Sequence, residues 1–219
     1  MSVRRDARRN RELLVAAARE VFAGQGLDAP FDEIARRAGV GNATLYRHFP
    51  TRAALIEEVF HDRLAHTVAA GERARGAEDG WSGLTGYLEE VFAGLAADRG
   101  ANDLMTSSIE GVPSLDAIHA HNRETVDLLL ARARESGVLR ADVTTEDLLL
   151  LLAALGRIVP ALAATVPDGW RRSLTLVLDG LRTGPAPARA LPGAPLSPGE
   201  LGDVLRDLGP HRARPASPA

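Results

Sequence analysis

The spacing of apolar residues along this 219-residue chain follows the period of an α-helix almost throughout. Near the N-terminus, Leu14, Ala17, Ala18, Val21 and Phe22 recur at intervals of three and four, which places them on one helix face. Val, Ile and Thr do not alternate with polar residues over the length of a strand, so the sequence predicts no sheet. The expected fold class is therefore all-α.

Residues that start and stop helices divide the first 60 positions into four segments. The first helix is expected to end near Gly26, and a second, shorter one ends at Gly39, where glycine commonly terminates a helix. Asn42 can cap a third helix by accepting a backbone hydrogen bond. That helix ends at Phe49-Pro50, because the residue before proline avoids helical angles. Thr51 is then expected to cap the fourth helix.

Longer helices are expected downstream. They are predicted over residues 52–75 and 79–98, briefly from Met105 to Ile109, from Pro113 to about Ser136, after the capping-box sequence at 144–147, and after Asp168. The apolar stretch 148–166 is interrupted by Arg157 and Pro160, whereas a membrane span needs ~20 predominantly apolar residues. We therefore expect a helix that is buried on most sides, and no contact with a membrane.

The C-terminal segment has a different composition. Eight of the thirteen prolines lie in residues 185–219, so most of this segment is expected to be extended or mobile. The exception is Ser197-Pro198-Gly199-Glu200, which reads as an N-cap, a proline in the first turn and a capping-box glutamate. A short amphipathic helix near 198–208 is expected to pack on the body of the protein.

Charge and cysteine content add two expectations. Residues 1–60 carry 10 Arg against 8 acidic residues, net +2, while residues 61–219 carry 16 against 21, net −5. The first eleven residues alone have a net charge of +4 and include Arg4 and Arg5, so this basic arm either contacts a polyanion or is a disordered, soluble terminus. The absence of cysteine and of an apolar N-terminal segment fits a cytoplasmic protein without a secretory signal.

The stretch GNATLYRHFP, residues 41–50, follows a glycine corner and carries many hydrogen-bonding side chains. Leu45 and Phe49 are four residues apart, so both can anchor a helix inward. The second and third helices, joined through residues 37–41, then form a helix-turn-helix. A helix in the major groove can read base edges, and Thr44, Arg47, Asn42 (where it is not used as a cap) and Ala43 suit this role.

Other residues suit contacts that position the protein without reading sequence. Tyr46 and His48 can contact phosphate or sugar, and Arg52, after Pro50, can bind another phosphate. The alternative is a surface helix with solvated polar residues. The glycine corner, the cap and the basic arm together favour DNA binding.

The sequence FDEIARRAGVGNATLYRHFPTRAALIEEVF resembles the N-terminal signature of tetracycline-repressor-type (TetR-family) regulators. The resemblance is strong over about residues 8–60, and the segment from RADVTTEDLLLLLAAL onward resembles one all-helical C-terminal subtype. It implies a cytoplasmic bacterial homodimer that binds a palindromic double-stranded DNA operator, usually as a repressor, and is released by a small-molecule effector. Where many members begin the second helix with Ser or Thr, this chain has Ala29-Pro30-Phe31, so no hydroxyl contact to phosphate is expected there, although backbone amides could serve.

These observations define a set of expected parts. Residues 1–51 form the DNA-binding domain, 52–184 a helical ligand-binding and dimerisation domain, and 185–219 a proline-rich tail with one helix. The expected DNA-contacting residues are Arg4, Arg5, Gly41, Asn42, Ala43, Thr44, Tyr46, Arg47, His48 and Arg52. Helices near 146–163 and 169–183 are expected to form the dimer interface, the alternative being that the first of them is simply central to the monomer. Leu88, Phe92, Met105 and Leu129 are expected to line the ligand pocket, the alternative being that they belong to the packed core.

Other classes of function have less support. The chain has no GxGxxG, P-loop or GxSxG sequence, so we do not expect an enzyme, and no cofactor is implied. His119 and His121 are two apart and do not share a helix face, and without cysteines or an HExxH pattern no metal site is predicted. The main alternative is a helical interaction protein whose helix-turn-helix is purely structural.

Overall fold

The structure, a computed structural model, describes residues 2–106, 109, 111–184 and 191–208, with side chains for all of these except residues 2–4 and 206–208. Its helices are α1 (Ser2–Gln25), α2 (Phe31–Ala38), α3 (Asn42–His48), α4 (Arg52–Arg75), α5 (Gly80–Ala97), α6 (Arg99–Thr106), α7 (Pro113–Glu135), α8 (Thr145–Thr165), α9 (Gly169–Leu181) and α10 (Pro198–Leu208). The described residues form no strand, only an isolated antiparallel bridge between Leu139 and Arg182. The predicted all-α fold class is confirmed.

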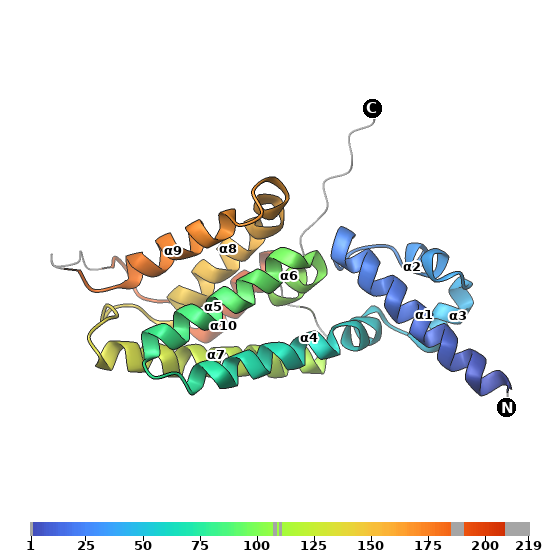
Figure 1. Cartoon of the computed structure of the whole chain (residues 1–219), viewed down its shortest axis with the longest axis horizontal. Helices are drawn as coiled ribbons and strands as arrows, with labels where there is room; N and C mark the ends of the chain where they lie inside the picture. The colour runs from blue at the N-terminus through green and yellow to red at the C-terminus, as the bar shows by residue number, and fades with distance from the viewer. Residues whose placement is uncertain (1, 107–108, 110, 185–190, 209–219) are drawn as a thin grey trace.

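The helices form two groups that α4 connects (Figure 1). Helices α1, α2 and α3 lie together at one end of the molecule, and α5 and α7–α10 form a bundle at the other. The first turns of α4 lie beside α1, and the rest of α4 packs along α5 and α7. Helix α6 lies between the two groups, because it contacts α1 as well as α5 and α8.

Most predicted helix ends are confirmed by local geometry. Gly26, Gly39 and Gly137 have φ values of 84°, 69° and 73°, a left-handed conformation that glycine adopts without a steric cost. Thr51 Oγ1 accepts a hydrogen bond from the Ala54 amide, and the predicted capping box at Thr144 and Asp147 is present.

Two predicted helix boundaries were wrong. Asn42 is the first residue of α3 and does not cap it; the N-cap position belongs to Gly41, whose backbone is extended. The short helix expected at 105–109 instead runs from Arg99 to Thr106, and Ile109 lies outside it. The helix starts at Arg99 because Asp98 accepts a hydrogen bond from the Ala101 amide. Its buried face includes the polar residues Asn102 and Asp103, so apolar periodicity could not identify it.

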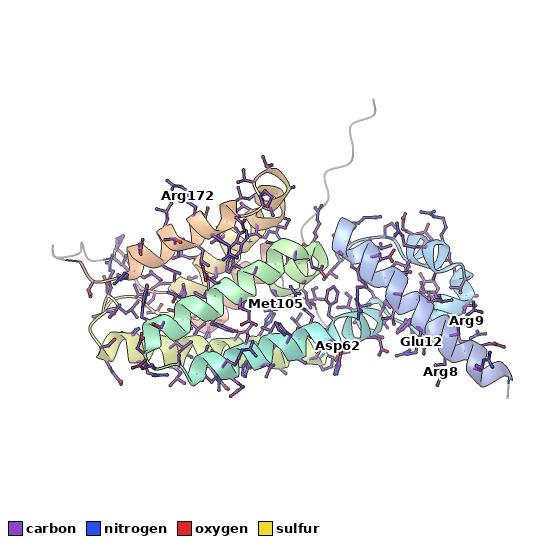
Figure 2. The ribbon with its side chains drawn as sticks, in the orientation of Figure 1. Arg8, Arg9, Glu12, Asp62, Met105 and Arg172 are labelled. Atoms are coloured by element: carbon purple, nitrogen blue, oxygen red, sulfur yellow. The ribbon has the colours of Figure 1, made fainter. Side chains whose placement is uncertain are left out.

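The basic N-terminal segment is helical rather than an irregular arm. Helix α1 begins at Ser2 and continues without interruption through the arginine-rich residues. Arg8 and Glu12, one turn apart, are 3.6 Å from each other on its exposed surface. Figure 2 shows that Arg8, Arg9 and Glu12 lie along the N-terminal part of α1. These arginines therefore occupy the same end of the molecule as α3 (Figure 1).

Two hydrophobic cores hold the helices together. The first combines the apolar faces of α1–α4 with residues of α6 and the start of α7, among them Leu104 and Leu115. The second lies between α4, α5, α7, α8 and α9, and in it the Phe92 and Trp170 rings stack with centroids 6.2 Å apart. The core of the N-terminal helices thus extends past residue 51 into the following domain.

Helix α8 was expected to be buried on most sides, and this was wrong. Only 28% of the most apolar stretch of α8 is buried. By length and composition alone, the helix is long and apolar enough to cross a membrane. One face packs against α5, α6, α9 and α10. The other face exposes Leu151 and Ile158, which is an unpartnered apolar surface in the single chain.

The predicted C-terminal helix is confirmed. Ser197 and Glu200 form the expected capping interactions at the start of α10, with Ser197 Oγ donating to the Glu200 carboxylate at 2.7 Å. Leu201 is buried against the bundle, and α10 contacts α8. The tail helix is therefore part of the folded domain.

Two helical glycines test the packing between the two helix groups. A Cβ at Gly100 in α6 would lie 2.9 Å from Phe22 Cβ and 2.9 Å from Phe60 Cζ, whereas a Cβ at Gly24 in α1 would meet nothing within 4 Å. We predict that Gly100→Ala lowers the free energy of unfolding by about 1–3 kcal/mol. Gly24→Ala, the matched control, should raise it by about 0.5–1 kcal/mol. Urea unfolding at one protein concentration measures both, and a Gly100→Ala variant as stable as the parent would contradict this packing.

Candidate DNA-binding surface and interior cavity

Helix α3 is held by two fully buried anchors. Leu45 and Phe49 are 0% and 1% exposed. The Arg11 guanidinium lies 4.4 Å from the centroid of the Phe49 ring and forms an ion pair with Glu58 at 2.9 Å. The C-terminal end of α3 is thereby fixed against both α1 and α4.

The turn between α2 and α3 depends on the left-handed conformation of Gly39. The Gly39 amide donates to the Arg36 carbonyl at 3.2 Å, and the Val40 amide to the Ala35 carbonyl at 3.0 Å. Gly41 then takes an extended conformation that starts α3. The predicted helix-turn-helix is formed.

The outward face of α3 carries most of the residues expected to contact DNA. Asn42, Ala43 and Arg47 are exposed, Tyr46 is 53% exposed, and Thr44 is half-buried. The Tyr46 ring packs against Phe31 of α2 with centroids 5.7 Å apart, yet about half of the residue remains exposed. The Asn42 side chain does not cap α3, so its expected contact with a base stays a prediction.

His48 departs from the expected phosphate contact. It is half-buried, and its Nε2 atom is buried without a hydrogen-bond partner among the described residues. Burial lowers its pKa, and the positive charges of Arg47 and Arg11 lower it further. His48 is therefore neutral near pH 7, and Nε2 cannot reach a phosphate in this conformation.

Arg52 also differs from its expected role as a phosphate clamp. Its Nη1 atom donates to the Leu27 carbonyl at 2.6 Å and to the Ala29 carbonyl at 2.8 Å, and the guanidinium lies 4.7 Å from the centroid of the Phe31 ring. The side chain is directed into the loop that precedes α2. Sequence position alone could not show that these carbonyls are within reach, and a phosphate contact by Arg52 stays a prediction.

A buried carboxylate holds the same loop from the other side. Asp103 of α6 is 0% exposed, and its Oδ2 atom accepts a hydrogen bond from the Leu27 amide at 3.0 Å. A Cβ at Gly26 would overlap this carboxylate, so glycine is required there for space as well as for its positive φ. We call residues 26–30, held between Arg52 and Asp103, the clamped loop.

The N-terminal arginines lie on the exposed surface of α1. Arg5 is exposed, while the side chain of Arg4 is outside the described residues. Arg11 is engaged within the fold, as described above. The positive charge near α3 therefore comes from the first turns of a helix.

The C-terminal bundle contains a cavity of about 400 Å³ bounded by α5, α6, α7, α8 and α10. Three of the predicted pocket residues, Leu88, Phe92 and Met105, line it. The fourth, Leu129, does not: it is fully buried where α7 packs against Gly83 of α5. Its apolar spacing indicated burial but could not tell packed core from cavity wall.

The polar lining of this cavity was not predicted. Tyr87 of α5 donates its hydroxyl hydrogen to Asn122 Oδ1 at 2.6 Å, and burial raises the Tyr87 pKa. His119, Asn122 and Arg123 all line the cavity from α7, and burial lowers the His119 pKa. Their spacing of three and four residues was a usable signal, since it places them on one helix face.

The two neighbouring histidines of α7 lie against different parts of the protein. As predicted, His119 and His121 face different neighbours: His119 lines the cavity, and His121 lies against Gly71 of α4. No group of three or more potential ligands occurs among the residues described.

Comparison with known proteins gives two family matches. Residues 14–59 match the family described as bacterial regulatory proteins, tetR family, and residues 81–183 match the family described as transcriptional regulator SbtR-like, C-terminal domain. Between them these segments include the helix-turn-helix and most of the cavity.

Individual relatives give the same result. A TetR transcription regulatory protein from Mycobacterium vanbaalenii is 34% identical, with 83% of this chain and 99% of that chain covered and a TM-score of 0.47. A TetR-family regulator from Agrobacterium tumefaciens shares the fold with a TM-score of 0.61. It is 15% identical, and the match covers 81% of this chain and 100% of that chain.

The curated relatives match over a shorter length. The HTH-type transcriptional regulator YvdT of Bacillus subtilis is 35% identical over 83 residues, which are 37% of this chain and 43% of YvdT. The chain thus spans less than half the length of the curated relatives it matches. All of these relatives are described as transcriptional regulators rather than enzymes. The chain belongs to the TetR family of DNA-binding transcriptional regulators.

Proposed function

We propose that this protein is a cytoplasmic repressor that binds a palindromic operator as a homodimer and releases it when a small molecule enters the cavity. The observation that carries the proposal is the outward face of α3. Asn42, Ala43, Tyr46 and Arg47 are exposed together on a helix whose opposite face is fully buried. A helix of this kind fits the major groove, where side chains can reach base edges.

The contacts divide into two kinds. Asn42, Ala43, Thr44 and Arg47 are placed to meet bases, with Gly41 allowing the backbone to approach the duplex. Tyr46 and the arginines at the start of α1, including Arg4 and Arg5, serve the phosphates and fix orientation. His48 and Arg52 act from inside the fold by supporting α3 and the clamped loop.

The exposed apolar faces of α8 and α9 support dimerisation. Ile158 of α8 is 51% exposed and Leu176 of α9 is 64% exposed, both large side chains with no partner in the single chain. In a two-fold dimer the same surface of each subunit meets its copy, so two helices from each subunit form a four-helix contact. Such a dimer holds its two α3 helices ~34 Å apart, one turn of DNA.

Helix α6 supports a route from the cavity to the DNA-binding helices. Met105 and Thr106 line the cavity, and Asp103, two residues earlier, holds the clamped loop through the Leu27 amide. A ligand that shifts α6 therefore moves the start of α2 as well as the base of α4. Useful regulation requires only ~1–3 kcal/mol of coupling between the two sites.

The alternative is a helical interaction protein whose helix-turn-helix is structural. The two functions are separated by selecting fragments from random DNA and measuring the affinity of the recovered operator as a function of salt. A regulator gives one recurring palindrome and a steep salt dependence, because bound phosphates release counterions. Failure to recover any preferred sequence supports the interaction protein.

Substitutions of arginine test which side chains face the duplex. We predict that Arg47→Ala weakens operator binding by about 1–3 kcal/mol, as expected for loss of a base-reading contact. Arg52→Ala should leave the slope of log affinity against log salt unchanged and lower the free energy of unfolding by about 1–3 kcal/mol, because two buried carbonyls lose their donor.

Arg73→Ala is the control for these variants, since Arg73 pairs with Glu90 on the surface of the C-terminal bundle. It should change neither operator affinity nor salt slope. A fall of about 1 in the slope for Arg52→Ala would restore that residue as a phosphate contact.

The dimer interface can be tested with two single variants, each of which replaces one exposed leucine by a charged residue. Leu176→Arg should shift the protein to monomer in sedimentation velocity and weaken operator binding, because a charge at the centre of an apolar interface is left without a partner. Leu128→Arg, on the exposed face of α7, is the matched control and should remain dimeric. Monomerisation by the control alone would assign the interface to α7.

The clamped loop generates a further prediction. Asp103→Asn should weaken operator binding by about fivefold, because the Leu27 amide loses a charged acceptor and the start of α2 is less restrained. Hydrogen exchange at the Leu27 amide should become faster in the same variant. If neither the exchange rate of the Leu27 amide nor the operator affinity changes, Asp103 does not couple the cavity to the DNA-binding helices.

A further inference from the structure

The charges around the cavity are already balanced within the protein. Arg123 lines the cavity, and its guanidinium is hydrogen-bonded to Glu146, whose side chain is only 11% exposed. A second carboxylate, Asp127, lies 3.9 Å from Arg123 Nε. Glu146 is in the first turn of α8, where the helix dipole also favours its negative charge. Among the residues described, Arg123 is the sole formally charged side chain on the wall.

This balance disfavours a charged ligand. An anion that bound Arg123 would have to displace Glu146, and the displaced carboxylate would be left buried without its partner. A cation would find no carboxylate among the described residues that line the wall. Burial lowers the pKa of His119 below its ordinary value, so the imidazole is neutral near pH 7 and adds no positive charge.

Of the polar groups that remain on the wall, Thr106 donates its hydroxyl hydrogen to the Asn102 carbonyl at 2.8 Å, whereas Asn122 and His119 can each donate to a ligand. Because the Tyr87 hydroxyl donates to Asn122 Oδ1, the Asn122 amide N–H groups are available to a ligand. His119 forms no hydrogen bond with any described residue, and its neutral ring keeps one N–H. The two side chains are three residues apart on the same face of α7, so they can donate to one oxygen atom.

Most of the rest of the wall is hydrocarbon. Val91 and Phe92 come from α5, Leu149 and Leu152 from α8, and Leu201 and Leu205 from α10. The tail helix thus forms one side of the cavity. A ligand held there contacts α10 directly, and its apolar part is removed from water.

We propose that the cavity binds an uncharged, mainly hydrocarbon molecule that carries a carbonyl or hydroxyl oxygen, with this oxygen at Asn122 and His119 and the hydrocarbon between α5, α8 and α10. This inference rests on the proposed ligand-responsive function and adds the chemical class of the effector. Fatty alcohols, ketones and neutral esters belong to the class, whereas carboxylates and amines of the same length do not.

The test compares three probes that differ only in the terminal group: decan-1-ol, decanoate and decylamine. Each is titrated, below its aggregation concentration, into the full chain without DNA. Tryptophan emission, measured in a Trp81→Phe background so that Trp170 is the only emitter, reports binding, because the Trp170 ring stacks on Phe92 of the cavity wall. Decan-1-ol should bind about tenfold more tightly than either charged probe and raise the melting temperature. Equal or tighter binding of a charged probe, or no binding of any probe, would overturn the proposal.

Variants locate the site and test its electrostatics. Glu146→Gln removes the carboxylate that neutralises Arg123, so decanoate should gain about fivefold in affinity while decan-1-ol is unaffected. Glu124→Gln is the matched control, because Glu124 is an exposed carboxylate on α7, adjacent in sequence to Arg123. The double variant Tyr87→Phe, Asn122→Leu should weaken decan-1-ol by about fivefold through loss of the amide donors. Decanoate binding that Glu146→Gln leaves unchanged would show that Arg123 is not held by Glu146.

Operator binding is measured separately so that the two proposals can fail independently. If decan-1-ol occupies the cavity but leaves operator affinity unchanged, the ligand class stands and ligand-controlled release is wrong. If instead a charged probe both occupies the cavity and releases the operator, regulation stands and the proposed class of ligand is wrong.

Discussion

The burial of Leu45 and Phe49 is the constraint on which the rest of the site depends. These two side chains, one helical turn apart, fix the rotation of α3 about its own axis, because neither can turn outward without exposing a large apolar surface. With that rotation fixed, the helical period points Asn42, Ala43 and Arg47 away from the protein. Arg11 reinforces the arrangement from α1 through its contacts with Phe49 and Glu58. Seven residues of helix can therefore present a defined surface.

Helix α6 connects the parts of the molecule that the proposed function requires to communicate. Asn102 donates its side-chain N–H to the Gly156 carbonyl of α8 at 2.8 Å, and Asp103 holds the clamped loop. Met105 and Thr106 reach the cavity. One helix of eight residues thus contacts a helix of the proposed dimer interface, the DNA-binding helices and the ligand cavity. A small displacement of α6 at the cavity can therefore shift its contacts with α8 and with the clamped loop, because packed cores transmit strain.

How much the sequence predicts depends on how local the determining interaction is. Helix ends such as Gly39, Thr51 and Thr144 were predicted because a cap or a left-handed glycine acts within a few residues of itself. The inward anchors of α3 followed from spacing alone. Arg52 could not be placed, because its partners, the Leu27 and Ala29 carbonyls, are set by tertiary packing.

The cavity shows the same limit. An apolar residue such as Leu129 has the spacing of a buried position whether it fills the core or lines a void. The spacing of His119, Asn122 and Arg123 places them on one helix face, but the sequence could not show whether that face lines a cavity or meets solvent. For helix α8 the sequence is apolar on nearly all sides. It therefore could not show which face packs in the bundle and which face stays exposed in the single chain. Each of these assignments requires knowledge of which helices are neighbours.

The most direct measurement of the central claim uses the absence of cysteine in this chain. A single cysteine introduced by Ala43→Cys lies on the exposed face of α3, and Ala141→Cys places one in an exposed loop far along the chain. The rate of maleimide modification is measured with and without the operator recovered from random DNA. Bound operator is expected to slow modification at position 43 by about tenfold and to leave position 141 unaffected, because we propose that α3 enters the groove. Equal modification of position 43 in the free protein and in the complex would contradict it.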